Sequence, residues 1–120
     1  PSGRLGLDGK SLMRLDGDML RHRHRMSFNG LIMVSLALNG DGRLLGAPQV
    51  SLEGLLDGGE AAAEAIADMS LAVAEAIAGM SRAQLMLTDE VAETARLAAR
   101  RWFHKAYDKK PVTKVHVMRL

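Results

Sequence analysis

The sequence contains no cysteine, so the chain has neither a disulfide framework nor a thiolate metal site. Its aromatic side chains are limited to one Trp, one Tyr and two Phe residues. A core with so few rings must be built from Leu, Val, Ile, Met and Ala, which favours a helix-rich domain. No signal peptide is visible, and no apolar run approaches the roughly 18 residues that a membrane-spanning helix requires. We therefore expect a cytoplasmic protein without membrane association.

Basic residues are missing from the middle third of the chain. Residues 44–81 contain six acidic residues and no Lys or Arg, whereas residues 1–43 carry seven basic residues against four acidic ones. Residues 82–120 carry nine basic residues against four acidic ones. The formal net charge of +2 therefore conceals separate acidic and basic regions. Such regions can meet in an oligomer, bind RNA on one side, or be ordinary solvated faces of the folded domain.

Apolar residues alternate along residues 31–38, LIMVSLAL, which predicts a strand that other parts of the chain must cover. Its strongly apolar face consists of Ile32, Val34, Leu36 and Leu38, and its other face consists of Leu31, Met33, Ser35 and Ala37.

The next residues predict a hairpin. Asn39-Gly40-Asp41-Gly42 is a turn sequence, because glycine tolerates positive φ. Residues 43–52 form the expected returning strand, and Pro48 places that strand at a sheet edge since proline cannot donate a ladder hydrogen bond. We expect residues 31–38 and 112–120 to have edges without such a block, which favours pairing with another chain.

Two helical segments follow. The first is expected to run from Gly59-Glu60 to Ala78-Gly79, with Gly79 as its C-cap. Its apolar stripe is formed by Ile66, Met69, Val73, Ile77 and Met80.

The second helix is expected to start with Thr88 as its N-cap and to stop before Pro111. Its apolar stripe is formed by Val91, Ala95, Ala98, Trp102 and Ala106. We therefore expect Trp102 in the core rather than as a ring on which a base stacks. Residues 112–120 alternate again, with Val115 and Val117 against His116 and Met118, and predict a third strand. The predicted class is α+β: a small three-stranded β-sheet covered by two α-helices in the order β-β-α-α-β, after an extended linker.

The linker is residues 1–20, which contain four glycines and no sustained periodicity. A basic run, Arg21-His22-Arg23-His24-Arg25, comes next. The His-x-His spacing begins several kinds of zinc site, but the further ligands such a site needs are missing nearby. The run is therefore interpreted as an exposed cationic segment. Elsewhere the sequence contains no nucleophile elbow, no phosphate loop and no His/Glu cluster with ligand spacing, so no catalytic residues are predicted.

Several short motifs follow one another in a fixed order. They are Pro1-Ser2-Gly3, Leu7-Asp8-Gly9, the basic run 21–25, Met26-Ser27, Asn29-Gly30, Gly46, Pro48, Ser51, Gly54 and Tyr107-Asp108-Lys109-Lys110-Pro111. Together they resemble the C-terminal domain of bacterial ribonuclease J, a metallo-β-lactamase/β-CASP ribonuclease, with the linker that precedes that domain. The resemblance covers nearly all 120 residues, and the alanine-rich helices are similar to an alphaproteobacterial version.

The resemblance implies a linker at 1–20 and the C-terminal domain at 21–120. It implies a parent enzyme that degrades and matures RNA by 5′–3′ exonuclease and endonuclease cleavage. The metal ions of that enzyme, zinc or alternatively manganese, are held by His/Asp motifs of its β-lactamase domain. Those motifs do not occur among these 120 residues. We therefore expect this chain to have no catalytic residue, metal or cofactor of its own.

In the family, this domain supports assembly into dimers or tetramers, and this is the function that the resemblance implies. Accessory RNA binding and docking of other degradosome proteins are the alternatives. One departure concerns RNA: many members have Ser-Arg-Gly after the second strand, whereas this chain has Ser51-Leu52-Glu53-Gly54. An acid near the arginine's place weakens the expectation of an RNA contact at this corner.

Two sets of candidate residues result. Those expected to contact RNA are Arg21, Arg23, Arg25, Lys109 and Lys110. Those expected at an oligomer interface are Leu31, Met33, Arg100, Arg101, Val115 and Val117.

Overall fold

The structure, a computed structural model, describes residues 30–56 and 58–120 of the chain. Along these residues the elements are β1 (Leu31–Leu38), β2 (Gln49–Glu53), α3 (Gly59–Ala78), α4 (Arg82–Leu85), α5 (Thr88–Tyr107) and β3 (Val112–Arg119). The α+β class and the order of the predicted elements are confirmed, and the four-residue α4 is an addition between the two long helices. The predicted linker 1–20 and the basic run 21–25 lie outside the described residues.

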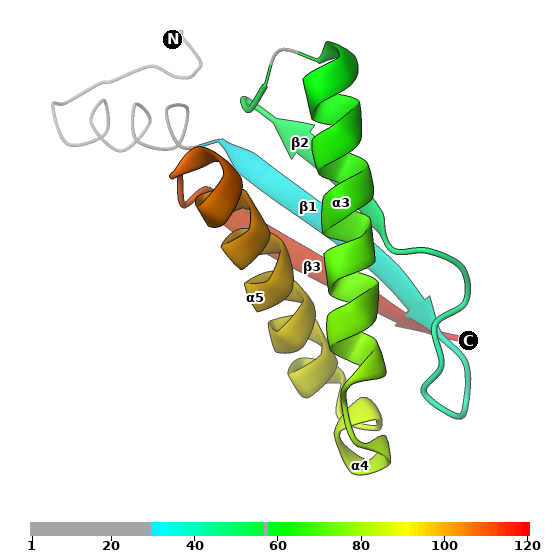
Figure 1. Ribbon diagram of the computed structural model, residues 1–120. Coiled ribbons are helices and arrows are strands. Elements are labelled where there is room, and N and C mark those ends of the chain that lie inside the picture. Colours follow the sequence, from blue (N-terminus) through cyan, green and yellow to red (C-terminus); the bar gives the residue numbers. More distant parts are fainter. Residues whose placement is uncertain (1–29, 57) are drawn as a thin grey trace, which may run out of the picture.

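The three strands form one mixed sheet in the order β2-β1-β3. β1 pairs antiparallel with β2 and parallel with β3. The parallel pairing requires a crossover from one edge of the sheet to the other, and α3 and α5 both belong to this crossover (Figure 1). β1 is therefore the central strand. The prediction that residues 31–38 expose a pairing edge is wrong, because β2 and β3 occupy both sides of that strand.

The connection from β1 to β2 is longer than the predicted four-residue turn. Asn39 Oδ1 accepts hydrogen bonds from the backbone N–H groups of Asp41 (2.8 Å) and Arg43 (3.0 Å), which closes the turn at Gly42. The chain then makes only an isolated bridge between Leu38 and Leu44 before β2 begins at Gln49. The returning strand expected at 43–52 is thus shorter, since the segment that leads to it ends in a proline without an N–H group.

Pro48 itself is buried, and its carbonyl oxygen accepts a hydrogen bond of 2.7 Å from the Ser70 hydroxyl of α3. This bond fixes the start of β2 against the first long helix. The prediction that the proline marks an edge strand is confirmed by the sheet order.

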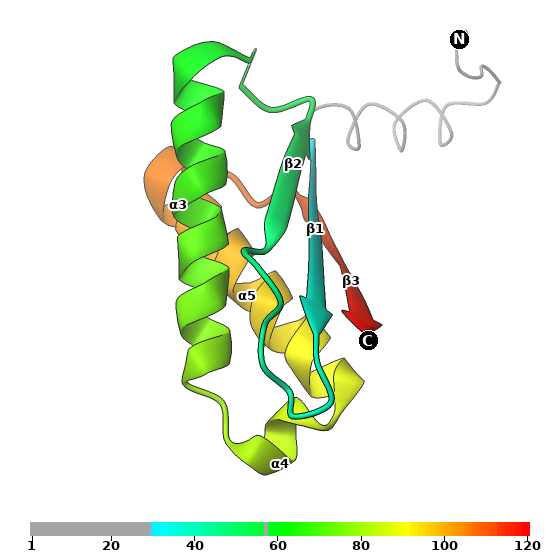
Figure 2. The same cartoon turned by 90° about the vertical axis from the view of Figure 1, so that its right-hand side faces the viewer.

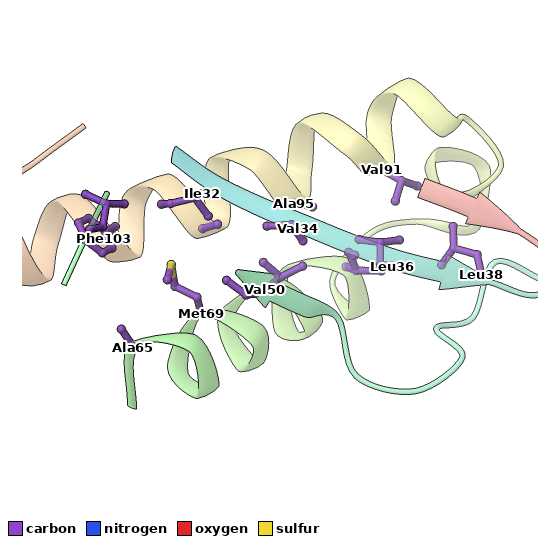
Figure 3. Close-up of a cluster of buried hydrophobic side chains, with 14 residues drawn as sticks. Ile32, Val34, Leu36, Leu38, Val50, Ala65, Met69, Val91, Ala95 and Phe103 are labelled. Atoms are coloured by element: carbon purple, nitrogen blue, oxygen red, sulfur yellow. The ribbon is translucent and has the colours of Figure 1, made fainter. Parts of the chain in front are cut away.

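The core lies between one face of the sheet and the two long helices, as Figure 3 shows. From β1 it receives the predicted apolar face, in which Ile32, Val34 and Leu38 have no exposed surface. The buried residues of α3 and α5 are Ala62, Ala65, Met69, Val73, Ile77, Val91, Ala95, Ala99 and Phe103. Several of these are alanines, which allow the helix backbones to approach the sheet closely.

The buried stripe of α5 differs from the predicted one after Ala95. It continues through Ala99 to Phe103, which is 1% exposed, whereas Trp102 is only partly buried and Ala106 is exposed. Spacings of three and four residues both fit a helical face, and the sheet beneath α5 selects the run with four-residue steps. Trp102 thus packs against the core, as expected, but is only partly buried, and the fully buried aromatic residue is Phe103, which the predicted stripe did not include.

The start of α5 also differs from the prediction. Leu87 occupies the N-cap position and Thr88 is the first helical residue. The Thr88 hydroxyl instead accepts a hydrogen bond of 2.8 Å from Nε of Arg119, whose Nη2 donates to the Leu85 carbonyl oxygen at 2.7 Å. The side chain is thus used to connect the helix to the end of β3. No helix in the described part of the chain is long and apolar enough to cross a membrane.

Candidate functional site

The described residues contain no group of three or more His, Asp or Glu side chains placed to hold a metal ion. The features of the fold that can carry a function are therefore its surfaces. Three of them stand out: the uncovered face of the sheet, a basic hollow on α5, and an apolar groove beside α4.

The first surface is the face of the sheet opposite the helices, here called the open face. In Figure 2 the three strands lie on one side of the molecule and α3 on the other. The strand register places on this face Leu31, Met33, Ser35 and Ala37 of β1, Gln49, Ser51 and Glu53 of β2, and Val112, Lys114, His116 and Met118 of β3. Among the described residues, no helix covers it.

The open face is apolar in the middle and charged at its sides. Leu31 and Met33 on the central strand are half-buried by their neighbours, and Val112 and Met118 on β3 are each 42% exposed. Glu53 lies on the β2 side, whereas Lys114 and His116 lie on the β3 side. The face therefore combines exposed apolar area with a negative and a positive edge.

The residues predicted at an oligomer interface fall in three different places. Leu31 and Met33 lie on the open face, while Val115 and Val117 pair with Val34 and Leu36 and so belong to the helix-covered face. Both valines are partly buried against the core. Arg100 and Arg101 lie on α5. A single flat interface cannot contain all six residues, because the sheet itself separates them.

The second surface is a shallow hollow of about 240 Å³ on the C-terminal half of α5, here called the basic hollow. It is lined by Leu97, Arg100, Arg101, His104 and Lys110. The first four share one helical face because they are three or four residues apart. Lys110 joins them because Asp108 adopts a left-handed conformation (φ 55°) that ends the helix and turns the chain towards β3.

The structure thus brings together residues that the sequence assigned to different roles. Lys110 was predicted to contact RNA, and Arg100 and Arg101 were predicted at an oligomer interface, yet all three line one hollow. Lys109 is exposed next to Lys110. Arg21, Arg23 and Arg25 lie outside the described residues, so their expected contact with RNA stays a prediction.

Two side-chain pairs of α5 flank this region. Nε2 of His104 lies 3.4 Å from Oδ1 of Asp108, one turn along the helix. Farther towards the N-terminus, Arg96 forms a bidentate pair with Glu93, with donor–acceptor distances of 2.9 and 2.7 Å. The hydrogen bonds from Arg96 hold the pKa of Glu93 below its ordinary value. Arg96 is therefore already engaged, whereas Arg100 and Arg101 form no ion pair with another described residue.

The third surface is an apolar groove of about 390 Å³ between the turn after β1, the end of α3 and α4. Its lining residues are Gly42, Arg43, Leu44, Ala74, Ile77, Ala78 and Leu85. Gly42 is buried there, and a Cβ added to it would lie 2.9 Å from Leu85. Sequence reasoning missed this groove because α4 has only four residues and no periodicity that a pattern could reveal.

A comparison with protein-family models gives a match to the ribonuclease J C-terminal domain over residues 18–120. The match includes every described strand and helix. No curated protein matches the chain.

Proposed function

The chain belongs to the ribonuclease J C-terminal domain family, and we propose that it holds two subunits of such a ribonuclease together through the open face of its sheet. The context of its function is RNA degradation. In this proposal the metal-dependent cleavage of RNA, with zinc or manganese, is carried out by other parts of the enzyme. The 120-residue chain contributes association.

The observation that carries this proposal is the uncovered sheet face itself. One face of a small antiparallel sheet can be exposed to solvent, but the side chains on that face are then usually polar. Here Leu31, Met33 and Val112 lie next to one another on the open face, and Met118 lies farther along β3, beside Ala37. Contiguous exposed apolar area of this kind marks interaction sites in soluble proteins.

A second copy of the chain fits this face because its two edges are oppositely charged. Sheets that pack face to face lie about 10 Å apart with their strands roughly aligned. A two-fold axis parallel to β1 places β1 over β1, and each copy's β2 over the other copy's β3. Glu53 of one copy then faces β3 of the other at the level of Val112, two residues from Lys114. The charges are self-complementary in this arrangement, which sets the orientation of the pair.

A charge-swap experiment tests this arrangement. We expect Glu53→Lys and Lys114→Glu each to weaken self-association of the chain by about tenfold or more, because each variant creates two like-charge contacts per dimer. An equimolar mixture of the two variants restores association, since every contact in the mixed dimer is again between opposite charges. Sedimentation equilibrium measures both effects, and circular dichroism verifies that each variant is folded.

The matched controls are Glu75→Lys and Lys105→Glu, which reverse exposed charges on the helix side of the sheet. They should leave the dissociation constant unchanged. A chain that is monomeric at millimolar concentration, or a mixture that associates no better than the single variants, would contradict the proposal.

A further inference from the structure

We propose that the basic hollow on α5 binds the phosphate backbone of single-stranded RNA through Arg100, Arg101 and Lys110. This site is separate from the proposed dimer interface, because α5 lies on the helix side of the sheet and the open face lies on the other side (Figures 1 and 2). The inference therefore adds a ligand to the domain and does not depend on its self-association.

The charge of the hollow is the first reason. Among the described residues, its lining contains two arginines, a lysine and a histidine, and no acidic residue. Arg100, Arg101 and Lys110 form no ion pair with another described residue, in contrast to Arg96, whose guanidinium is bound to Glu93. Three cationic side chains without a counterion among the described residues gather in one concavity, which attracts a polyanion rather than a neutral ligand.

The chemistry of the donors is the second reason. A guanidinium presents its N–H groups as a planar fork that matches two phosphate oxygens, and a lysine adds a mobile point charge. Arg100 and Arg101 are consecutive on the helix, so their side chains leave it in directions about one quarter turn apart and can reach successive phosphates. Leu97 gives the hollow an apolar wall against which a ribose or base can pack.

Two features oppose an anion here, and both are weak. The C-terminal end of a helix carries partial negative charge, but salt screens this effect at the surface. The carboxylate of Asp108 is nearby, but it is 97% exposed and paired with His104 rather than with the arginines. Charge-assisted hydrogen bonds from three side chains outweigh both.

We favour RNA over an acidic protein surface as the ligand of the hollow. The chain belongs to a ribonuclease J domain family, and substrate RNA is present wherever a ribonuclease J acts. The competing occupant is the acidic region of a second copy, which would make Arg100 and Arg101 assembly residues. The two occupants predict different results for the same variants.

The test measures binding of a fluorescent single-stranded RNA of about 15 nucleotides, a length that spans the site of one small domain. Anisotropy titrations at several salt concentrations compare the wild-type chain with Arg100→Ala/Arg101→Ala and with Lys110→Ala. The matched control is Arg43→Ala/Arg82→Ala, which removes the same charge from two exposed positions away from the hollow, one in the turn after β1 and one at the start of α4. Sedimentation of each variant is measured in parallel.

We expect the double variant to bind RNA about tenfold or more weakly than the control. Its salt dependence should flatten by about 0.7 in log–log slope for each lost phosphate contact, since single strands release counterions in this proportion. The loss should be similar for RNAs of different sequence, because phosphate contacts carry no sequence information. RNA binding equal to that of the control would overturn the proposal. Unchanged RNA binding with a lower oligomeric mass would assign the hollow to subunit contact instead.

Discussion

The two faces of β1 are built from similar residues and have different surroundings. On the covered face, Leu36 is 3% exposed and packs beneath the helices. On the open face, Leu31 has the same side chain and is only half-buried. The covered face receives all of its partners from the same chain. The open face receives none from the described helices, and this is the face that we propose a second copy of the chain covers.

Because of this difference, one face of β1 contributes to the stability of the fold and the other face is available for interaction with a partner. Removing apolar area from water stabilises the fold only when folding itself buries that area. The residues of the covered face meet this condition, whereas those of the open face keep part of their apolar area in water until a partner covers it. Mutations on the two faces should therefore change different observables: the free energy of unfolding for one, and the dissociation constant for the other.

The largest expected effect concerns the covered side of α5. Phe103→Ala should lower the free energy of unfolding by about 3–5 kcal/mol, because it removes a fully buried ring and leaves a cavity. Trp102→Ala should cost clearly less, since Trp102 lies at the border of the core with its ring centroid 6.3 Å from that of Phe103. Urea denaturation followed by circular dichroism measures both. An equal or larger loss for Trp102 would contradict the burial order of the two rings.

The next effect compares the two faces directly with one chemical change. Leu36→Ala should lower the free energy of unfolding by about 2–5 kcal/mol, as expected for a buried leucine. Leu31→Ala should lower it by less than about 1 kcal/mol when the chain is monomeric, because the side chain already lies partly in water. The same Leu31 variant should weaken self-association. Equal losses of stability at both positions would show that the open face is covered within the chain itself.

The smallest effect concerns the exposed pair between Glu93 and Arg96, which belongs to neither face. Arg96 lowers the pKa of Glu93 in the folded state below the ordinary value of 4.5. The pair therefore stabilises the fold above that pH, and this contribution is lost as the pH falls through the lowered pKa. Glu93→Gln should reduce stability slightly at pH 7 and by a smaller amount at pH 3. Urea midpoints at the two pH values measure this, with Glu75→Gln as the control.

Much of the fold could be predicted because its signals are local. The two-residue alternation at 31–38 predicted both the strand and the residues of its buried face, and the structure confirms them. The first long helix occupies the expected residues, because its apolar stripe and its terminal glycines agree on the same boundaries. The combination of short motifs also indicated the family correctly.

The features that could not be predicted depend on contacts between distant segments. The sequence gives no sign that residues 112–119 pair parallel with β1, and this pairing makes β1 central and leaves β3 as an edge. The choice between Trp102 and Phe103 depends on how α5 is rotated over the sheet. The sheet also separates Val115 and Val117 from Leu31 and Met33, although all four are alternating apolar residues on strands.

The sequence alone therefore determined the elements, their order, the apolar face of β1 and the family, because each of these follows from local periodicity or from short motifs. Only the tertiary structure decided which sheet face remains open and which cations gather on one surface. Arg100, Arg101 and Lys110 are neighbours because Asp108 turns the chain back at the end of α5, and Glu53 and Lys114 lie on one face because of the strand register. The strand register and the rotation of α5 over the sheet are set by packing across the whole domain, so they cannot be predicted from a local sequence pattern.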